Sequence, residues 1–114
     1  MRDENLAIQE IPAPAGQRIL RLTGPLVLNS FFAFQTMIRE DETQLLILDF
    51  SAVPYIDSAG IGALVGAYVH RQKDGRRLLL VAVAPRVRTA LKVTKVEPFF
   101  QFSDSLPAAA SASQ

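Results

Sequence analysis

The stretch Tyr55-Ile56-Asp57-Ser58-Ala59-Gly60-Ile61-Gly62 joins the two segments that decide the fold. Before it, residues 45–50 are almost entirely apolar, which indicates a strand covered on both faces, as in a parallel sheet. After it, residues 59–73 predict a long apolar helix. Asp57 or Ser58 can cap this helix, because a side-chain oxygen there accepts a backbone N–H that lacks a partner. An acid, a hydroxyl and two glycines thus stand at a strand–loop–helix junction, where open α/β folds gather ligands and partners.

The remaining chain predicts further strands and helices around this junction. The first two strands form a hairpin, because Pro12, Pro14 and Gly16 make a turn between them. Strand–helix–strand units then impose parallel, right-handed crossovers. Strands are predicted over residues 6–11, 18–23, 45–50, 78–83 and 99–102. Helices are predicted from Asn29 or Ser30 to about Arg39, over 59–73, from Pro85, and in a short piece that begins at Leu106.

A longer run around the junction carries a family resemblance. Residues 47–64, ILDFSAVPYIDSAGIGAL, resemble the signature of the STAS domain family, above all its single-domain anti-sigma factor antagonists. The resemblance extends over about residues 6–106. It implies an α/β fold with a STAS-like mixed β-sheet, mainly parallel with an antiparallel N-terminal edge, packed against about four helices. We expect one such domain over residues 1–106, followed by a short C-terminal helix or frayed tail over 107–114.

The resemblance also implies a function. In the family, the serine after the aspartate is phosphorylated by a partner kinase that is also the anti-sigma factor, and this residue is Ser58. The unphosphorylated protein sequesters that anti-sigma factor/serine-protein kinase, phosphorylation releases it, and a phosphatase resets the cycle. Val27 stands where the family commonly carries an aspartate that aids kinase recognition. The implied protein is a monomer or weak dimer and not an enzyme.

The long helix has two different sides. Ile61, Leu64, Val65 and Tyr68 are predicted to face the sheet. The opposite stripe is small and apolar instead of charged and consists of Ala59, Ala63, Gly66, Ala67 and His70. Either a partner packs against that stripe, or other parts of the monomer cover it. Phe32 lies off the apolar face of its own helix, either partly buried or as an exposed anchor for a partner. The predicted partner-binding residues are Asp57, Ser58, Ala59, Gly60, Ile61, Gly62, Ala63, Gly66, Ala67, His70 and Phe32.

Composition excludes several function classes. The 114-residue chain has a net charge of +1, so it lacks the strong field that nucleic acid binding needs. It has no cysteine and one histidine, which excludes disulfides and a multi-histidine metal site within one chain. Its N-terminus lacks the apolar core of a signal peptide, and its apolar runs are too short to insert in a membrane. We therefore expect a cytoplasmic protein without a cofactor.

Other chemistries fit the sequence poorly. Ser58 is not a hydrolase nucleophile, because Ile56 stands where the nucleophile elbow requires glycine. Asp49 is interpreted as a structural cap for the following loop, not as a phosphoacceptor. The charged run over 39–44 is predicted to be a solvated connection. Arg86, Arg88, Lys92 and Lys95 form either a solvated helix face or a contact for an acidic partner.

Two alternatives to the phosphorylation switch stay open. One is a constitutive STAS interaction subunit of a signalling scaffold or an ABC-type transporter complex, in which Ser58 is never modified. The other is a small-nucleotide-binding module that uses the glycines near Ser58, although the acid expected about 20 residues later is absent.

Overall fold

The computed structural model describes residues 6–106, which form a five-stranded sheet in the order β1-β2-β3-β4-β5. The edge strand β1 (Ala7–Ile11) pairs antiparallel with β2 (Gln17–Thr23). The other pairs are parallel and involve β3 (Leu45–Ala52), β4 (Arg77–Val81) and β5 (Gln101–Ser103). This arrangement confirms the predicted mixed sheet with an antiparallel N-terminal edge.

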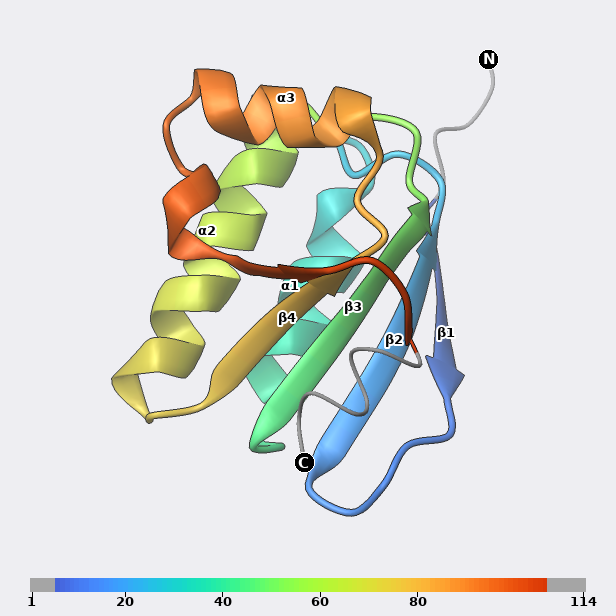
Figure 1. Cartoon of the computed structure of the whole chain (residues 1–114), viewed down its shortest axis with the longest axis vertical. Helices are drawn as coiled ribbons and strands as arrows, with labels where there is room; N and C mark the ends of the chain where they lie inside the picture. The colour runs from blue at the N-terminus through green and yellow to red at the C-terminus, as the bar shows by residue number, and fades with distance from the viewer. Residues whose placement is uncertain (1–5, 107–114) are drawn as a thin grey trace.

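Three α-helices lie within residues 6–106: α1 (Phe31–Glu40), α2 (Ser58–Lys73) and α3 (Pro85–Val93). Helices α1 and α2 run side by side on one face of the sheet, and α3 crosses near the carboxyl ends of the parallel strands (Figure 1). The fourth predicted helix falls almost wholly outside the described residues. Helix α2 descends from the end of the sheet at which β3 finishes, so its N-terminus lies at that end (Figure 1).

The core forms because the central strands are apolar on both faces. On the helix side, Leu20, Leu48 and Leu80 lie in register across β2, β3 and β4 and are buried beneath α1 and α2. On the other side, Ile19, Ile47 and Leu79 lie in register and form a second apolar cluster. Strand β2 is buried on both faces, and it changes register against β3 after Arg21.

The structure corrects the predicted end of the sheet. Residues 97–99 form a 3-10 turn with Pro98 inside it, and β5 begins only at Gln101. Proline has a fixed φ and no N–H, so it suits the first turn of such a helix better than a strand. Phe99 is therefore not a strand residue but stacks on Tyr68 of α2, with ring centroids 5.7 Å apart.

The connection between α1 and β3 is not simply solvated, which corrects a second prediction. Asp41 is buried, and its carboxylate accepts from the guanidinium of the fully buried Arg71 at 2.7 Å and from Arg18 at 3.1 Å. Arg71 also donates to the main-chain oxygens of Thr43 and, at 2.9 Å, Arg77. This network ties the C-terminal end of α2 to the connection before β3 and to the start of β4.

Candidate phosphorylation site and partner-binding face

Asp57 is the residue that caps α2. Its carboxylate accepts from the main-chain N–H of Gly60 at 2.9 Å and from that of Leu28 at 3.1 Å. The bond from Gly60 satisfies an N–H of the first helical turn, and the bond from Leu28 fixes the loop between β2 and α1. The sequence allowed Asp57 or Ser58 in this role, and the geometry selects Asp57.

Gly60 lets that loop approach α2 closely. A Cβ atom built on Gly60 would lie 2.0 Å from the main-chain oxygen of Leu26 and 2.7 Å from Cγ1 of Ile56. The Leu26 oxygen accepts from the N–H of Asp57 at 3.4 Å, and Leu26 pairs with Ile56 in an isolated parallel bridge. No residue larger than glycine fits this position without a shift of the backbone.

Ser58 is thereby left free at the first position of α2. Its side chain is exposed and has no hydrogen-bond partner among residues 6–106. The main-chain N–H groups of Ser58 and Ala59 also lack an acceptor within the described part of the chain. The hydroxyl of Ser58 is therefore accessible from solvent, and the N-terminus of a helix favours negative charge beside its unpaired N–H groups.

The small-residue stripe of α2 divides into a covered and an open part. Ala63 and Ala67 are each only 5% exposed and pack in the core beside α1, so the monomer itself covers them. Gly62 and Gly66 are exposed, and a Cβ on either would meet nothing within 4 Å. Helix α1 thus covers the alanines within the monomer and leaves the two glycines open.

The other predicted partner-binding residues lie at different depths. Phe32 is 71% exposed, which decides between the two interpretations of this residue in favour of the exposed one. Gly60 is buried, while Asp57, Ala59, Ile61 and His70 are partly exposed. Leu28 is 66% exposed and was not singled out from the sequence, because only the bond from its N–H to Asp57 places it beside Ser58. Whether these residues contact a partner stays a prediction.

Two buried residues near the site serve the loops around it. Val27 is 6% exposed, and its N–H donates to Oγ of Ser30 at 3.0 Å. Ser30 also donates to the main-chain oxygen of Pro25 at 2.7 Å, so its hydroxyl braces the loop and does not cap α1. Asn29 does not occupy the N-cap position, which is Ser30.

Asp49 is the cap that the sequence predicted for the loop after β3. Its carboxylate accepts from the N–H of Ser51 and from Arg21, both at 2.9 Å. Burial alone raises the pKa of Asp49, but these hydrogen bonds outweigh it and hold the pKa below its ordinary value. The same balance lowers the pKa of Asp41, where burial is outweighed by hydrogen bonds from Thr43, Arg18 and Arg71.

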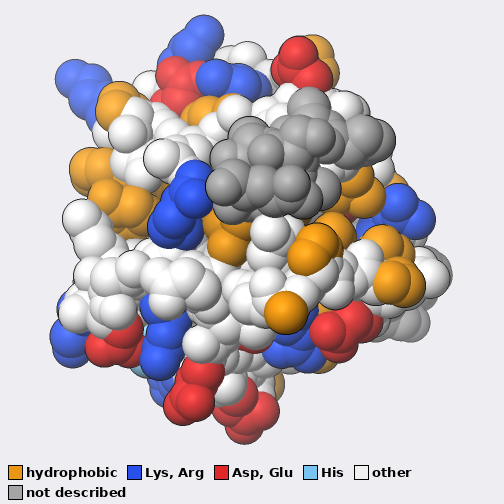
Figure 2. Space-filling model, turned by 60° about the horizontal axis from the view of Figure 1, so that its bottom comes forward, with side chains coloured by type: hydrophobic (Ala, Val, Ile, Leu, Met, Phe, Trp, Pro, Cys, Tyr) orange, Lys and Arg blue, Asp and Glu red, His pale blue; other side chains and the backbone are white. Residues whose placement is uncertain are grey.

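The surface offers no strong field of one sign on the side seen in Figure 2, where acidic and basic side chains are interspersed. On α3, Arg88 pairs with Glu97 and lies over the ring of Phe102, so it belongs to the packing of the fold. Arg86 lies 5.1 Å from the ring centroid of Tyr55, just before the junction.

Within residues 6–106, no group of three or more His, Cys, Asp or Glu could hold a metal ion. No helix in this range is long and apolar enough to cross a membrane.

Known proteins resemble this chain over nearly its whole length. An anti-sigma factor antagonist from Mycobacterium paratuberculosis superimposes with a TM-score of 0.82 at 21% identity, covering 97% of this chain and 96% of the other. A sulfate transporter family protein from Wolinella succinogenes has a TM-score of 0.74 at 25% identity and covers 90% and 88%.

The phosphorylated form of SpoIIAA, a Bacillus cell fate determinant, has a TM-score of 0.72 at 19% identity and covers 95% of this chain and all 100% of the other. At 21% and 19% identity, the Mycobacterium paratuberculosis protein and SpoIIAA show that this chain shares their fold. The model of the STAS domain matches residues 6–109. This chain therefore belongs to the STAS domain family.

Proposed function

We propose that this protein is an anti-sigma factor antagonist that sequesters an anti-sigma factor/serine kinase and releases it when Ser58 is phosphorylated. The observation that carries the proposal is the exposed, unbonded hydroxyl of Ser58 beside the uncovered glycines of α2. STAS domains and the antagonists that share this fold are regulatory binding modules. The fold is also that of a protein solved in its phosphorylated form.

The two open glycines support a partner that docks on α2. Glycine inside a helix costs roughly 1 kcal/mol relative to alanine, yet nothing in the described chain packs on Gly62 or Gly66. A backbone or a large side chain of another protein could approach α2 closely only at such positions. The exposed side chains of Leu28 and Phe32 would border this face and supply apolar contacts.

Phosphorylation would act on this interface and not on the fold. It adds roughly −1.5 to −2 charges at Ser58, where the helix N-terminus accommodates a phosphate. A partner docked over Ser58 would have to desolvate this dianion, which a transient interface cannot offset. Release therefore follows from the position of Ser58 at the edge of the docking face.

The first test is the intact mass of the protein purified from its own host, with and without phosphatase treatment. We expect a phosphatase-sensitive phosphate that maps to Ser58. Pull-downs from that host should recover a serine kinase with Ser58→Ala as bait and lose it with Ser58→Asp, whose melting temperature stays within a few degrees. Gln72→Glu is the matched control, because it adds a negative charge on the same helix roughly 21 Å away.

Two results would contradict the proposal. One is an unmodified mass under every growth and stress condition. The other is equal recovery of partners by Ser58→Ala and Ser58→Asp. Either would favour a constitutive STAS interaction subunit, an alternative supported by the likeness to the sulfate transporter family protein and by Val27 in place of the family's aspartate. A small-nucleotide-binding module would instead gain melting temperature with GTP or ATP.

A further inference from the structure

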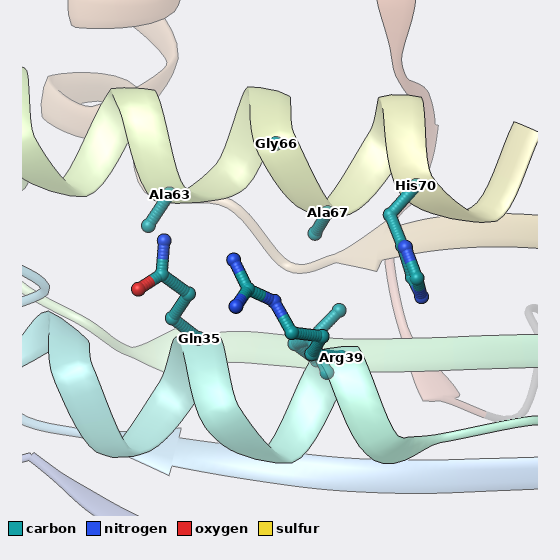
Figure 3. Close-up of a pocket in the computed structure, with 7 residues that line it drawn as sticks. Gln35, Arg39, Ala63, Gly66, Ala67 and His70 are labelled. Carbon is teal, nitrogen blue, oxygen red and sulfur yellow. The ribbon is translucent and has the colours of Figure 1, made fainter.

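A groove of about 100 Å³ separates α1 from α2 on the surface of the protein. Its lining combines three side chains with nitrogen donors and four apolar or small residues: Gln35, Arg39 and His70, and Ile38, Ala63, Gly66 and Ala67. Gln35 and Arg39 rise from α1 toward α2, and His70 reaches from α2 toward α1 (Figure 3). The guanidinium of Arg39 faces the turn of α2 that contains Gly66 (Figure 3).

The donors of this groove are not used within the described chain. Gln35, Arg39 and His70 have no hydrogen bond or ion pair to any residue among 6–106. In contrast, Arg18, Arg21, Arg71 and Arg88 all pair with carboxylates. No acidic side chain lines the groove, and α2 contains no Asp or Glu between Ser58 and Lys73. The groove therefore has unpaired donors and positive charge, and no acidic side chain lines it.

We propose that the α1–α2 groove binds a carboxylate group. A guanidinium presents paired N–H donors that match the two oxygens of a carboxylate, and the amide of Gln35 and the imidazole of His70 can add further donors. Because Ala63, Ala67 and Gly66 have small side chains or none, space remains between the two helices for the aliphatic part of the ligand that carries the carboxylate. The carboxylate comes from an Asp or Glu side chain of a protein docked on α2 or from a small organic acid.

An NMR titration of the ¹⁵N-labelled full chain with sodium acetate tests this proposal, with sodium chloride at equal ionic strength as reference. We expect saturable shifts of the Arg39 and His70 side chains and of the Gly66 and Ala67 amides. Arg39→Gln should weaken acetate binding roughly tenfold, as the loss of a charged hydrogen bond does. Arg86→Gln, which removes an exposed arginine of α3, should leave it unchanged.

Three outcomes would overturn the assignment: shifts that match those in chloride, shifts that persist fully in Arg39→Gln, and phosphate binding tighter than acetate. Gly66→Ala provides a second variant that should fold, because its methyl group meets nothing within 4 Å. It should also weaken acetate binding. If N-acetyl-glutamate amide binds more tightly than succinate, the source is a protein side chain, and the reverse order identifies a free organic acid. No step of this experiment requires Ser58 phosphorylation, so its failure is distinct from that of the proposed function.

Discussion

The three glycines within α2 are predicted to respond in opposite ways to the same substitution. Gly60→Ala places a Cβ 2.0 Å from the main-chain oxygen of Leu26, where no real contact is possible. That oxygen is held by the N–H of Asp57 and by the bridge between Leu26 and Ile56, so the backbone cannot yield cheaply. Overpacking costs roughly 1–3 kcal/mol of stability. We expect Gly60→Ala to lower the free energy of unfolding by about the upper end of this range or more.

Gly62→Ala and Gly66→Ala should instead stabilise the protein. Neither new methyl group meets an atom within 4 Å, so each variant keeps the gain in helix propensity, up to about 1 kcal/mol. Urea unfolding followed by circular dichroism measures all three variants on one scale. In a domain of this size, about 1 kcal/mol moves Tm by roughly 4 °C or more, so the two directions are readily separated. A neutral Gly60→Ala, or a destabilised Gly62→Ala or Gly66→Ala, would refute the packing argument.

The same variants separate a functional reason for the glycines from a structural one. If a partner packs on this face of α2, Gly62→Ala and Gly66→Ala should gain stability and lose partner binding. If no partner uses the face, they should gain stability and bind as well as the wild type. Gly60→Ala cannot make this distinction, because loss of fold and loss of binding would coincide.

Four further predictions concern the supports of the site. Asp57→Ala should cost about 1 kcal/mol or more in thermal unfolding through loss of the cap, whereas Asp57→Asn should recover only part of it, because Gly60 and Leu28 donate to different carboxylate oxygens and an amide offers one acceptor oxygen. Arg71→Met should cost about 3–5 kcal/mol in urea unfolding, because it breaks a buried ion pair and leaves Arg18 as the remaining cation beside Asp41 among the described residues; a loss under 1 kcal/mol would show that the pair is not needed. The pKa values of Asp41 and Asp49 are depressed in the folded state, so both carboxylates stabilise the fold above the unfolded carboxyl pKa of about 3.9, and this stabilisation is lost as the pH falls through their folded pKa values. Asp49→Asn should therefore make the free energy of unfolding fall less steeply with decreasing pH in this acidic range. Phe32→Ala should leave Tm nearly unchanged and weaken partner capture, since the ring is 71% exposed; a marked drop in Tm would show that it packs in the protein instead.

The parts of the fold that follow from local patterns could be predicted from the sequence. The apolar run of β3, the turn before β2 and the proline that begins α3 each have one strong local explanation, and the structure confirms them. The charged connection after α1 could not be predicted in this way. Arg71 is fully buried, and two of its bonding partners, Asp41 and Thr43, are 30 and 28 residues away in sequence, so no local pattern distinguishes it from an exposed arginine.

The small-residue stripe of α2 shows why sequence periodicity leaves an interface undecided. A helix that packs against another helix and one that packs against a partner require the same small residues, because both allow a backbone to approach closely. The structure separates the two uses only after α1 is in place: Ala63 and Ala67 pack in the core beside α1, while a Cβ on Gly62 or Gly66 would meet no described residue within 4 Å. The alanines are thus explained by the monomer. The glycines are not, since alanine would fit at both and stabilise the helix. On this helix, these two positions provide the strongest argument for a partner, and they follow Ser58, on whose free hydroxyl the proposed switch depends, by about one and two helical turns.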